Sequence, residues 1–231
     1  MSEPRAIVFD LDDTLYPLRR FVLSGFAEVA EVVAFEVGVP SERVARTLRS
    51  ARSAARGQEL QHLCRRFDLP ASDVARLVEI VRGHTPRLLL PRETAGVLAA
   101  LRPRWRLGVL TNGPAAIQRR KVAALGLAGL VDAVVFAAEC GDGRGKPARA
   151  AFLTVLDRLA TSAARTVFVG DDLEADIFGA RRVGMRTIHV ARGGCTDRRA
   201  ACAPDARVTR LRSVPPAAAR LVEGDHRVHT V

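Results

Sequence analysis

The sequence predicts an α/β protein with a mostly parallel sheet and one all-helical insertion. Five short apolar runs recur along the 231 residues, which is the pattern of strands buried on both faces. Stretches with one apolar stripe at helical spacing lie between most of these runs. Strands that alternate with helices favour a parallel sheet covered by helices on both faces. Between Phe21 and Val81 the alternation stops and only helical patterns remain.

The predicted strands are short and rich in Val, Ile, Leu and Phe. The first comprises Ala6 to Phe9 and ends directly before Asp10. The later ones are 106–111, 133–136, 165–170 and 187–190. Helices are predicted after the first four strands, over 93–101, 115–125, 148–159 and 176–183. Gly126 and Gly184 follow two of these helices and are typical helix stops.

The insertion of about seventy residues is predicted to contain three or four helices. An amphipathic pattern covers 21–37, and another helical stretch covers 59–67. Ser41 and Ser72 are the expected N-caps of two further helices. We therefore expect two domains, an α/β core formed by 1–15 and 86–231, and a helical domain formed by 16–85.

Composition excludes several classes of protein. The chain is 48% hydrophobic and long enough to bury a core without disulfides or a structural metal. No apolar run approaches the roughly 18 residues of a membrane helix, and the N-terminus lacks the apolar region of a signal peptide. We expect a soluble cytoplasmic protein. Its four cysteines, Cys64, Cys140, Cys195 and Cys202, lack CxxC spacing and are expected to be free thiols.

The net charge of +11 does not by itself indicate a nucleic-acid partner. Of the 36 basic residues only Lys121 and Lys146 are lysines, and the arginines are spread along the whole chain. Nucleic-acid binders usually cluster basic residues on one element with aromatic residues between them, and aromatic residues make up only 5% here. We expect no nucleic acid as main partner. A basic surface would still attract anionic substrates.

Acidic residues follow two of the predicted strands directly. Because residues two apart in extended backbone point the same way, Asp10 and Asp12 should converge and Asp13 should diverge. Asp171 stands at the end of another strand. Ligand sites of open α/β sheets lie at these strand ends. Together Asp10 and Asp171 would make an all-oxygen site suited to Mg²⁺. Asp176 lies nearby and would also serve as a first-turn acid of the helix that it is expected to open.

Two further segments carry candidate polar groups. Thr111 and Asn112 end a third strand, although Thr-Asn-Gly is also an ordinary turn. Lys146 follows a glycine-rich segment whose backbone could approach a phosphate. It is one of two lysines in a chain that otherwise uses arginine, which a site that needs a compact point charge and not a planar fork would explain. Lys121 lies on the helix predicted after Asn112, and we expect it at the surface.

Taken in order, these segments resemble the haloacid dehalogenase-like (HAD) hydrolase superfamily. The matching motifs are Asp10-Leu-Asp12-Asp-Thr14-Leu, Thr111-Asn112-Gly113, Lys146-Pro147 and Gly170-Asp171 through Asp176. The similarity extends from Ala6 to about Leu221. It implies a Rossmann-like three-layer core, and the helical insertion resembles the small cap of members that carry it after the first motif. The cap would set substrate choice, with Tyr16, Arg19 and Arg20 either lining its entrance or forming a solvated hinge.

The resemblance also implies roles for individual residues. Asp10 is similar to the nucleophile that becomes an aspartyl-phosphate, and Asp12 to the acid/base. Thr111 and the amide of Asn112 would bind the phosphoryl oxygens, and Lys146 would neutralise their charge. The Mg²⁺ ligands would be Asp10, Asp171 and the carbonyl of Asp12. Asp172 and Asp176 would position water, metal or Lys146.

Asp12 favours a phosphatase over a dehalogenase. An alkoxide leaving group needs a proton and a halide does not, and the dehalogenases of this superfamily lack an acid two residues after the nucleophile. The expected substrate is a small phosphate monoester such as a nucleotide, a sugar phosphate or a phospho-acid. Two alternatives stay open, a phosphomutase or other phosphotransferase, and a basic binding module on an inactive scaffold. We expect no membrane partner and a monomer or homodimer.

Overall fold

The computed structural model describes residues 3–54, 56–191 and 202–223. Its centre is a six-stranded sheet in the order β3-β2-β1-β4-β5-β6. Every neighbouring pair is parallel. The predicted α/β class with a Rossmann-like sheet is therefore confirmed. The strands are β1 (Ala6–Phe9), β2 (Arg106–Thr111), β3 (Ala133–Phe136), β4 (Thr166–Gly170), β5 (Arg186–Val190) and β6 (Ala206–Val208).

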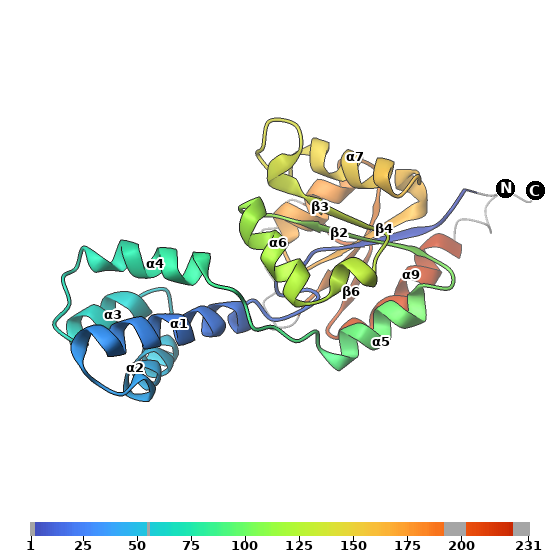
Figure 1. The fold of residues 1–231 in the computed structure, drawn as a ribbon. Coiled ribbons are helices and arrows are strands. Elements are labelled where there is room, and N and C mark those ends of the chain that lie inside the picture. The colour runs from blue at the N-terminus through green and yellow to red at the C-terminus, as the bar shows by residue number, and fades with distance from the viewer. Residues whose placement is uncertain (1–2, 55, 192–201, 224–231) are drawn as a thin grey trace, which may run out of the picture. The chain divides into compact units, whose positions relative to one another are not determined.

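Helices cover both faces of this sheet. Figure 1 shows α7 (Arg149–Arg158) on one face and α5 (Arg92–Leu101) with α9 (Val214–Glu223) on the other. Helix α6 (Ala115–Ala124) follows β2 and packs against β3. Under α7, the side chains of Phe152 and Val155 pack with Val8 and Phe168 of the sheet, and all four are buried. Burial on both faces explains why the central strands are continuous apolar runs.

Two elements of the core differ from the prediction. Strand β6 was not predicted, because three residues with one exposed side chain give no strand pattern. The helix expected over 176–183 begins earlier, as a π-helical segment over Leu173–Phe178 that continues into α8 (Gly179–Arg181). Its N-cap is Asp172, whose carboxylate accepts hydrogen bonds from the amides of Glu174 and Ala175. Asp176 therefore lies inside this helical segment and does not open it.

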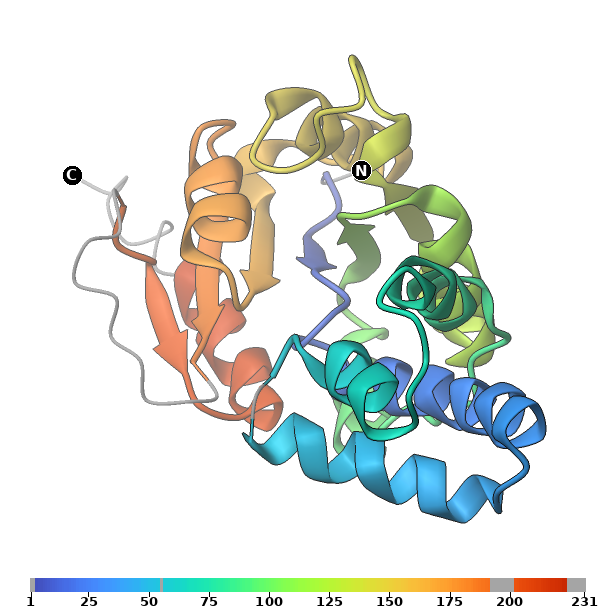
Figure 2. The same ribbon diagram turned by 90° about the vertical axis from the view of Figure 1, so that its left-hand side faces the viewer.

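The insertion consists of helices, as expected. These are α1 (Arg19–Val37), α2 (Ser41–Ala54), α3 (Glu59–Arg66) and α4 (Asp73–Gly83). Figure 2 shows α1 and α2 side by side, and their apolar stripes meet in a cluster that includes Val29, Val33 and Leu48. Ser72 occupies the N-cap position of α4 as predicted but makes no side-chain capping bond.

The chain divides into two compact units. One comprises Met1–Pro17 with Leu89–Val231, and the other comprises Leu18–Leu88. All candidate site residues belong to the first unit. Within the described residues, no helix has the length and apolar character needed to cross a membrane.

Candidate active site

The candidate site is built on three neighbouring strands that end together. β1 lies between β2 and β4, and Phe9 pairs in register with Val109 on one side and Val169 on the other. The residues that follow are therefore brought to one edge of the sheet. The amide of Asp10 continues the ladder and donates to the carbonyl of Val169 at 2.9 Å. This parallel register explains why segments more than a hundred residues apart in sequence meet here.

Lys146 lies between two of the predicted carboxylates. Its Nζ is 2.5 Å from Oδ1 of Asp10 and 2.7 Å from Oδ1 of Asp176, and it donates to the carbonyl of Leu110 at 3.1 Å. All three charged side chains are buried. Burial alone would lower the pKa of Lys146, but the charges of Asp176 and Asp10 raise it above the usual range. Lys146 is therefore a buried ammonium held by charge pairing.

Three carboxylates come together at this edge. Asp10, Asp171 and Asp176 each offer an oxygen, and these oxygens lie within 4.8 Å of one another. Burial raises the pKa of Asp10 and of Asp176 despite the nearby Lys146. Burial and then the charge of Asp10 raise the pKa of Asp171 to about 6. Three hard oxygen donors whose repulsion Lys146 offsets only in part fit a divalent cation such as Mg²⁺.

The loop that carries Lys146 is fastened to the end of β2 by Asn112. The side chain Oδ1 of Asn112 accepts from the amide of Lys146 at 2.7 Å, and its Nδ2 donates to the Lys146 carbonyl at 3.0 Å. Gly145 has a φ of +70°, and a Cβ there would stand 2.7 Å from the same Oδ1. A glycine at 145 thus allows the close approach, which explains part of the glycine-rich sequence before Lys146.

Asp12 faces α6. The Tyr16 hydroxyl donates to its Oδ1 at 2.6 Å, and Nε2 of Gln118 donates to its Oδ2 at 3.0 Å. Nζ of Lys121 lies 2.9 Å from Oδ1 and 2.8 Å from Oδ2. The expectation that Lys121 is a surface residue was wrong, because only 4% of it is exposed. Tyr16 is fully buried, so the alternative of a solvated hinge was also wrong for this residue.

The remaining predicted residues lie around these groups. Thr111 ends β2 and is buried, and its hydroxyl accepts from Nε2 of Gln118 at 2.5 Å. Asp171 accepts from the hydroxyl of Thr14 at 3.2 Å. The exposed Asp172 uses one carboxylate oxygen as the helix cap described above. Asp13 is exposed with a φ of +58°, in agreement with its predicted divergence.

Sequence reasoning missed Gln118 and gave Thr14 no role. Gln118 and Lys121 lie three residues apart on α6, which places both on one side of the helix. That spacing, together with the rarity of lysine in this chain, is the signal that would have found them. The free thiols expected at Cys64, Cys140 and Cys202 are confirmed, and Cys195 lies outside the described residues.

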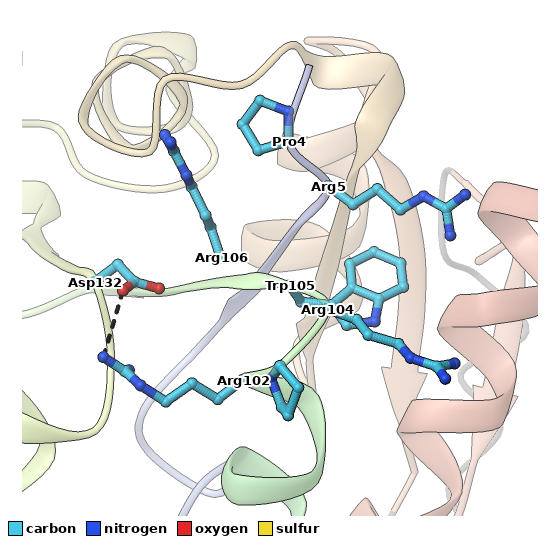
Figure 3. Close-up of a pocket in the computed structure, with 8 residues that line it drawn as sticks. Pro4, Arg5, Arg102, Arg104, Trp105, Arg106 and Asp132 are labelled. Atoms are coloured by element: carbon cyan, nitrogen blue, oxygen red, sulfur yellow. Dashed lines mark ion pairs between the residues drawn. The ribbon is translucent and has the colours of Figure 1, made fainter. Parts of the chain in front are cut away.

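A pocket of about 410 Å³ lies at the opposite, amino end of the sheet (Figure 3). Arginines dominate it, but two of them already bind neighbouring groups. Arg102 pairs with Asp132 at 3.6 Å and Arg106 donates to the Leu159 carbonyl at 2.6 Å. The first contact joins the end of α5 to the residue before β3, and the second joins β2 to the end of α7, so these two arginines serve the fold.

Buried carboxylates and a buried lysine at the carboxyl edge of a parallel α/β sheet define the active site of an enzyme. A family model described as haloacid dehalogenase-like hydrolase matches residues 4–184. The chain belongs to this family.

Known relatives agree with this assignment. The chain is 28% identical to a glyceraldehyde 3-phosphate phosphatase of Methanopyrus kandleri, over 84% of this chain and 86% of the relative. It is 30% identical to the phosphatase of the same name from Pyrococcus abyssi, over 80% of each. A solved 2-haloacid dehalogenase from Pseudomonas syringae has a TM-score of 0.64 and 27% identity, over 94% of this chain and 99% of that one.

Proposed function

We propose that this hydrolase is a Mg²⁺-dependent phosphatase that releases phosphate from a small phosphate monoester through an aspartyl-phosphate on Asp10. The observation that carries the proposal is the contact of Asp10 with Lys146 at the carboxyl ends of β1, β2 and β4. A carboxylate attacks a phosphate dianion only when nearby cations offset the repulsion between them. Lys146 is one such cation, and the carboxylates of Asp10 and Asp171 are suited to hold the other.

In the first step Asp10 acts as nucleophile. One of its carboxylate oxygens forms a bond to phosphorus while the bond from phosphorus to the alcohol oxygen breaks. Asp12 donates its proton to that oxygen, so that the product leaves as a neutral alcohol. Thr111 and the amide of Asn112 bind the transferring phosphoryl oxygens, and Lys146 offsets their charge.

In the second step Asp12 acts as base. It removes a proton from a water molecule whose oxygen attacks phosphorus, and the bond between phosphorus and Asp10 breaks. Inorganic phosphate is released and Asp10 is free again. Asp12 ends the cycle protonated, which is the form that the next first step requires.

Asp10, Asp171 and the backbone carbonyl of Asp12 would hold Mg²⁺. When bound, the metal supplies positive charge that shields nucleophile and phosphate from each other. Asp176 would then keep Lys146 directed at Asp10, since it accepts a hydrogen bond from the same Nζ. Asp172, as the helix cap, would fix the segment that carries Asp176.

The acid at position 12 favours phosphate monoesters over haloacids, because only the alkoxide needs a proton as it leaves. Relatives that act on glyceraldehyde 3-phosphate support a small phosphorylated metabolite as substrate. We further propose that the helical segment 16–85 serves as the cap that selects it.

A phosphate-release assay over a panel of small monoesters, with and without Mg²⁺, tests the proposal. Asp10→Asn should abolish turnover while the circular dichroism spectrum and melting temperature show a folded protein. Rapid acid quench with labelled substrate should trap a phosphoenzyme in the wild type and none in Asp10→Asn. Phosphate release by Asp10→Asn at the native rate would refute the mechanism. A phosphomutase would instead isomerise a sugar phosphate without net release of phosphate.

A further inference from the structure

The Asp12 carboxylate accepts hydrogen bonds from residues outside the turn that follows β1 as well as from within it. Four hydrogen bonds reach its two oxygens, one from Tyr16, one from Gln118 and two from the Lys121 ammonium. Each oxygen accepts two of them, which uses the full acceptor capacity of a carboxylate. Two of the three donor residues come from α6, more than a hundred residues away in sequence. The orientation of Asp12 is therefore set largely by α6.

The sequence of α6 is unusual for a helix that packs on a sheet. The side chains it buries are Gln118, Lys121 and Val122, so two of the three are polar. Burial of an ammonium is costly unless it is paired, and a buried ion pair seldom stabilises a fold more than an apolar residue of similar size. Packing alone therefore gives no reason for Lys121 at this position, whereas a requirement on Asp12 does.

Gln118 links the acid/base to the phosphate site. Its Nε2 carries two hydrogens and donates to two oxygens, Oδ2 of Asp12 at 3.0 Å and the hydroxyl of Thr111 at 2.5 Å. One amide group thus fixes the spacing between the group proposed to move protons and a group proposed to bind the phosphoryl oxygens. If that spacing changed, Asp12 would no longer lie at the right distance from the leaving oxygen of a phosphate held by Thr111, and proton transfer to this oxygen would slow.

We propose that Lys121 and Gln118 are positioning residues of the reaction, which act through Asp12. They hold its carboxyl group where the protonated acid protonates the leaving alcohol in the first step and the carboxylate takes the proton of water in the second. This inference rests on the proposed function. It predicts an effect that depends on the leaving group, because a nitrophenolate leaves without a proton and an alkoxide does not.

The test compares Lys121→Met and Gln118→Leu with the wild-type enzyme, all saturated with Mg²⁺. With an alkyl phosphate such as glycerol 3-phosphate, kcat/KM should fall about ten- to a hundredfold. With p-nitrophenyl phosphate, kcat/KM should change much less. Its kcat should still fall, with a burst of nitrophenolate, because hydrolysis of the phosphoenzyme also needs Asp12. Lys121→Arg, which keeps the charge, should recover part of the loss.

A matched control lies two residues away on the same helix. Arg119 is exposed and pairs with Glu139, so Arg119→Met removes an equal charge without touching Asp12. This variant should have the wild-type kcat/KM with both substrates. In an Asp12→Asn background, Lys121→Met should cost nothing further, since residues that act as one unit are not additive.

Three results would overturn the inference. Equal losses on both substrates, with a matching rise in the inhibition constant of inorganic phosphate, would mean that Lys121 only attracts anions. A full additional loss in the Asp12→Asn background would mean that it acts independently. Wild-type behaviour of Lys121→Met beside an inactive Asp10→Asn would remove this inference alone, whereas an active Asp10→Asn would remove the proposed function.

Discussion

Gly170 and Asp176 are in such close contact that no larger residue fits at position 170. A Cβ built on Gly170 would stand 2.2 Å from Oδ2 of Asp176 and 2.5 Å from its carboxyl carbon. Asp176 is only 1% exposed and holds Lys146 through its other oxygen. The last residue of β4 therefore controls the position of Lys146 through Asp176.

Gly170→Ala should displace Asp176 and with it Lys146. We expect kcat/KM for phosphate monoesters to fall about hundredfold, the order of effect that a misplacement of 1 Å produces. The added Cβ would also stand 2.6 Å from Cβ of Asp176, so the helical segment that carries Asp176 must shift as well, and the melting temperature should fall. Steady-state kinetics together with a thermal melt measure the two effects.

Gly96 offers the matched control, because a Cβ there meets nothing within 4 Å and it lies on the exposed side of α5. Gly96→Ala should keep full activity and stabilise the fold by roughly 0.5–1 kcal/mol, as expected for a helix interior. A Gly170→Ala enzyme with native kcat/KM would contradict the link between Gly170 and Lys146.

Asn112→Ala should affect stability as well as activity. It removes both hydrogen bonds to the backbone of Lys146, each worth about 1 kcal/mol. We expect a lower urea midpoint and a loss of kcat larger than the loss in substrate binding. Arg144→Ala is the control from the same loop, since its ion pair with Asp142 is exposed and exposed pairs contribute little to stability. Similar urea midpoints for the two variants would argue against the anchoring role of Asn112.

The sequence was sufficient to locate Asp10, Thr111 and Asp171, because each directly follows or ends an apolar strand. Parallel strands in one sheet bring their carboxyl ends together, so position along the chain translates into proximity in space. The same rule does not apply to α6. A helix presents a different residue to its surroundings at every 100° of rotation, and only tertiary packing decides which face is buried. Lys121 was misplaced for that reason.

The sequence also could not predict which of Asp172 and Asp176 caps the helix and which one is buried. Both follow β4 within six residues, and a run of acids there is compatible with several starting points for the helix. The structure starts the helical segment at Leu173, which makes Asp172 the cap and turns Asp176 inward.

The cysteines provide a test that depends on pH and is independent of the active site. Cys64 is 2% exposed, and burial raises the pKa of its thiol. A raised pKa leaves less thiolate at pH 8 than an ordinary thiol has, and thiolate is the form that alkylating reagents attack. In a Cys195→Ser background, iodoacetamide should modify Cys64 at least about tenfold more slowly than the half-exposed Cys202 at pH 8.

Raising the pH from 8 to 9 should accelerate the modification of Cys64, because the fraction of its thiolate is still increasing over this range. Peptide mapping by mass spectrometry assigns each rate. The buried Cys140 serves as an internal reference for slow access. Modification of Cys64 as fast as Cys202 in the folded protein would contradict its burial among α1–α4.

Mg²⁺ should stabilise the folded protein by binding to Asp10 and Asp171 in the acidic cluster. A metal that binds only the folded state at about a hundred times its dissociation constant contributes about 2.7 kcal/mol. For a protein of this length that corresponds to a rise in melting temperature of roughly 5–10 °C.

Asp171→Asn removes one charge from the cluster and should abolish most of the rise, whereas Asp142→Asn, an exposed acid outside it, should preserve the rise. The melts are recorded in EDTA and in MgCl₂ at matched ionic strength, so that general screening cancels. An equal rise in all three proteins would place the metal outside this cluster, and the division of roles between Lys146 and the cation would then fail.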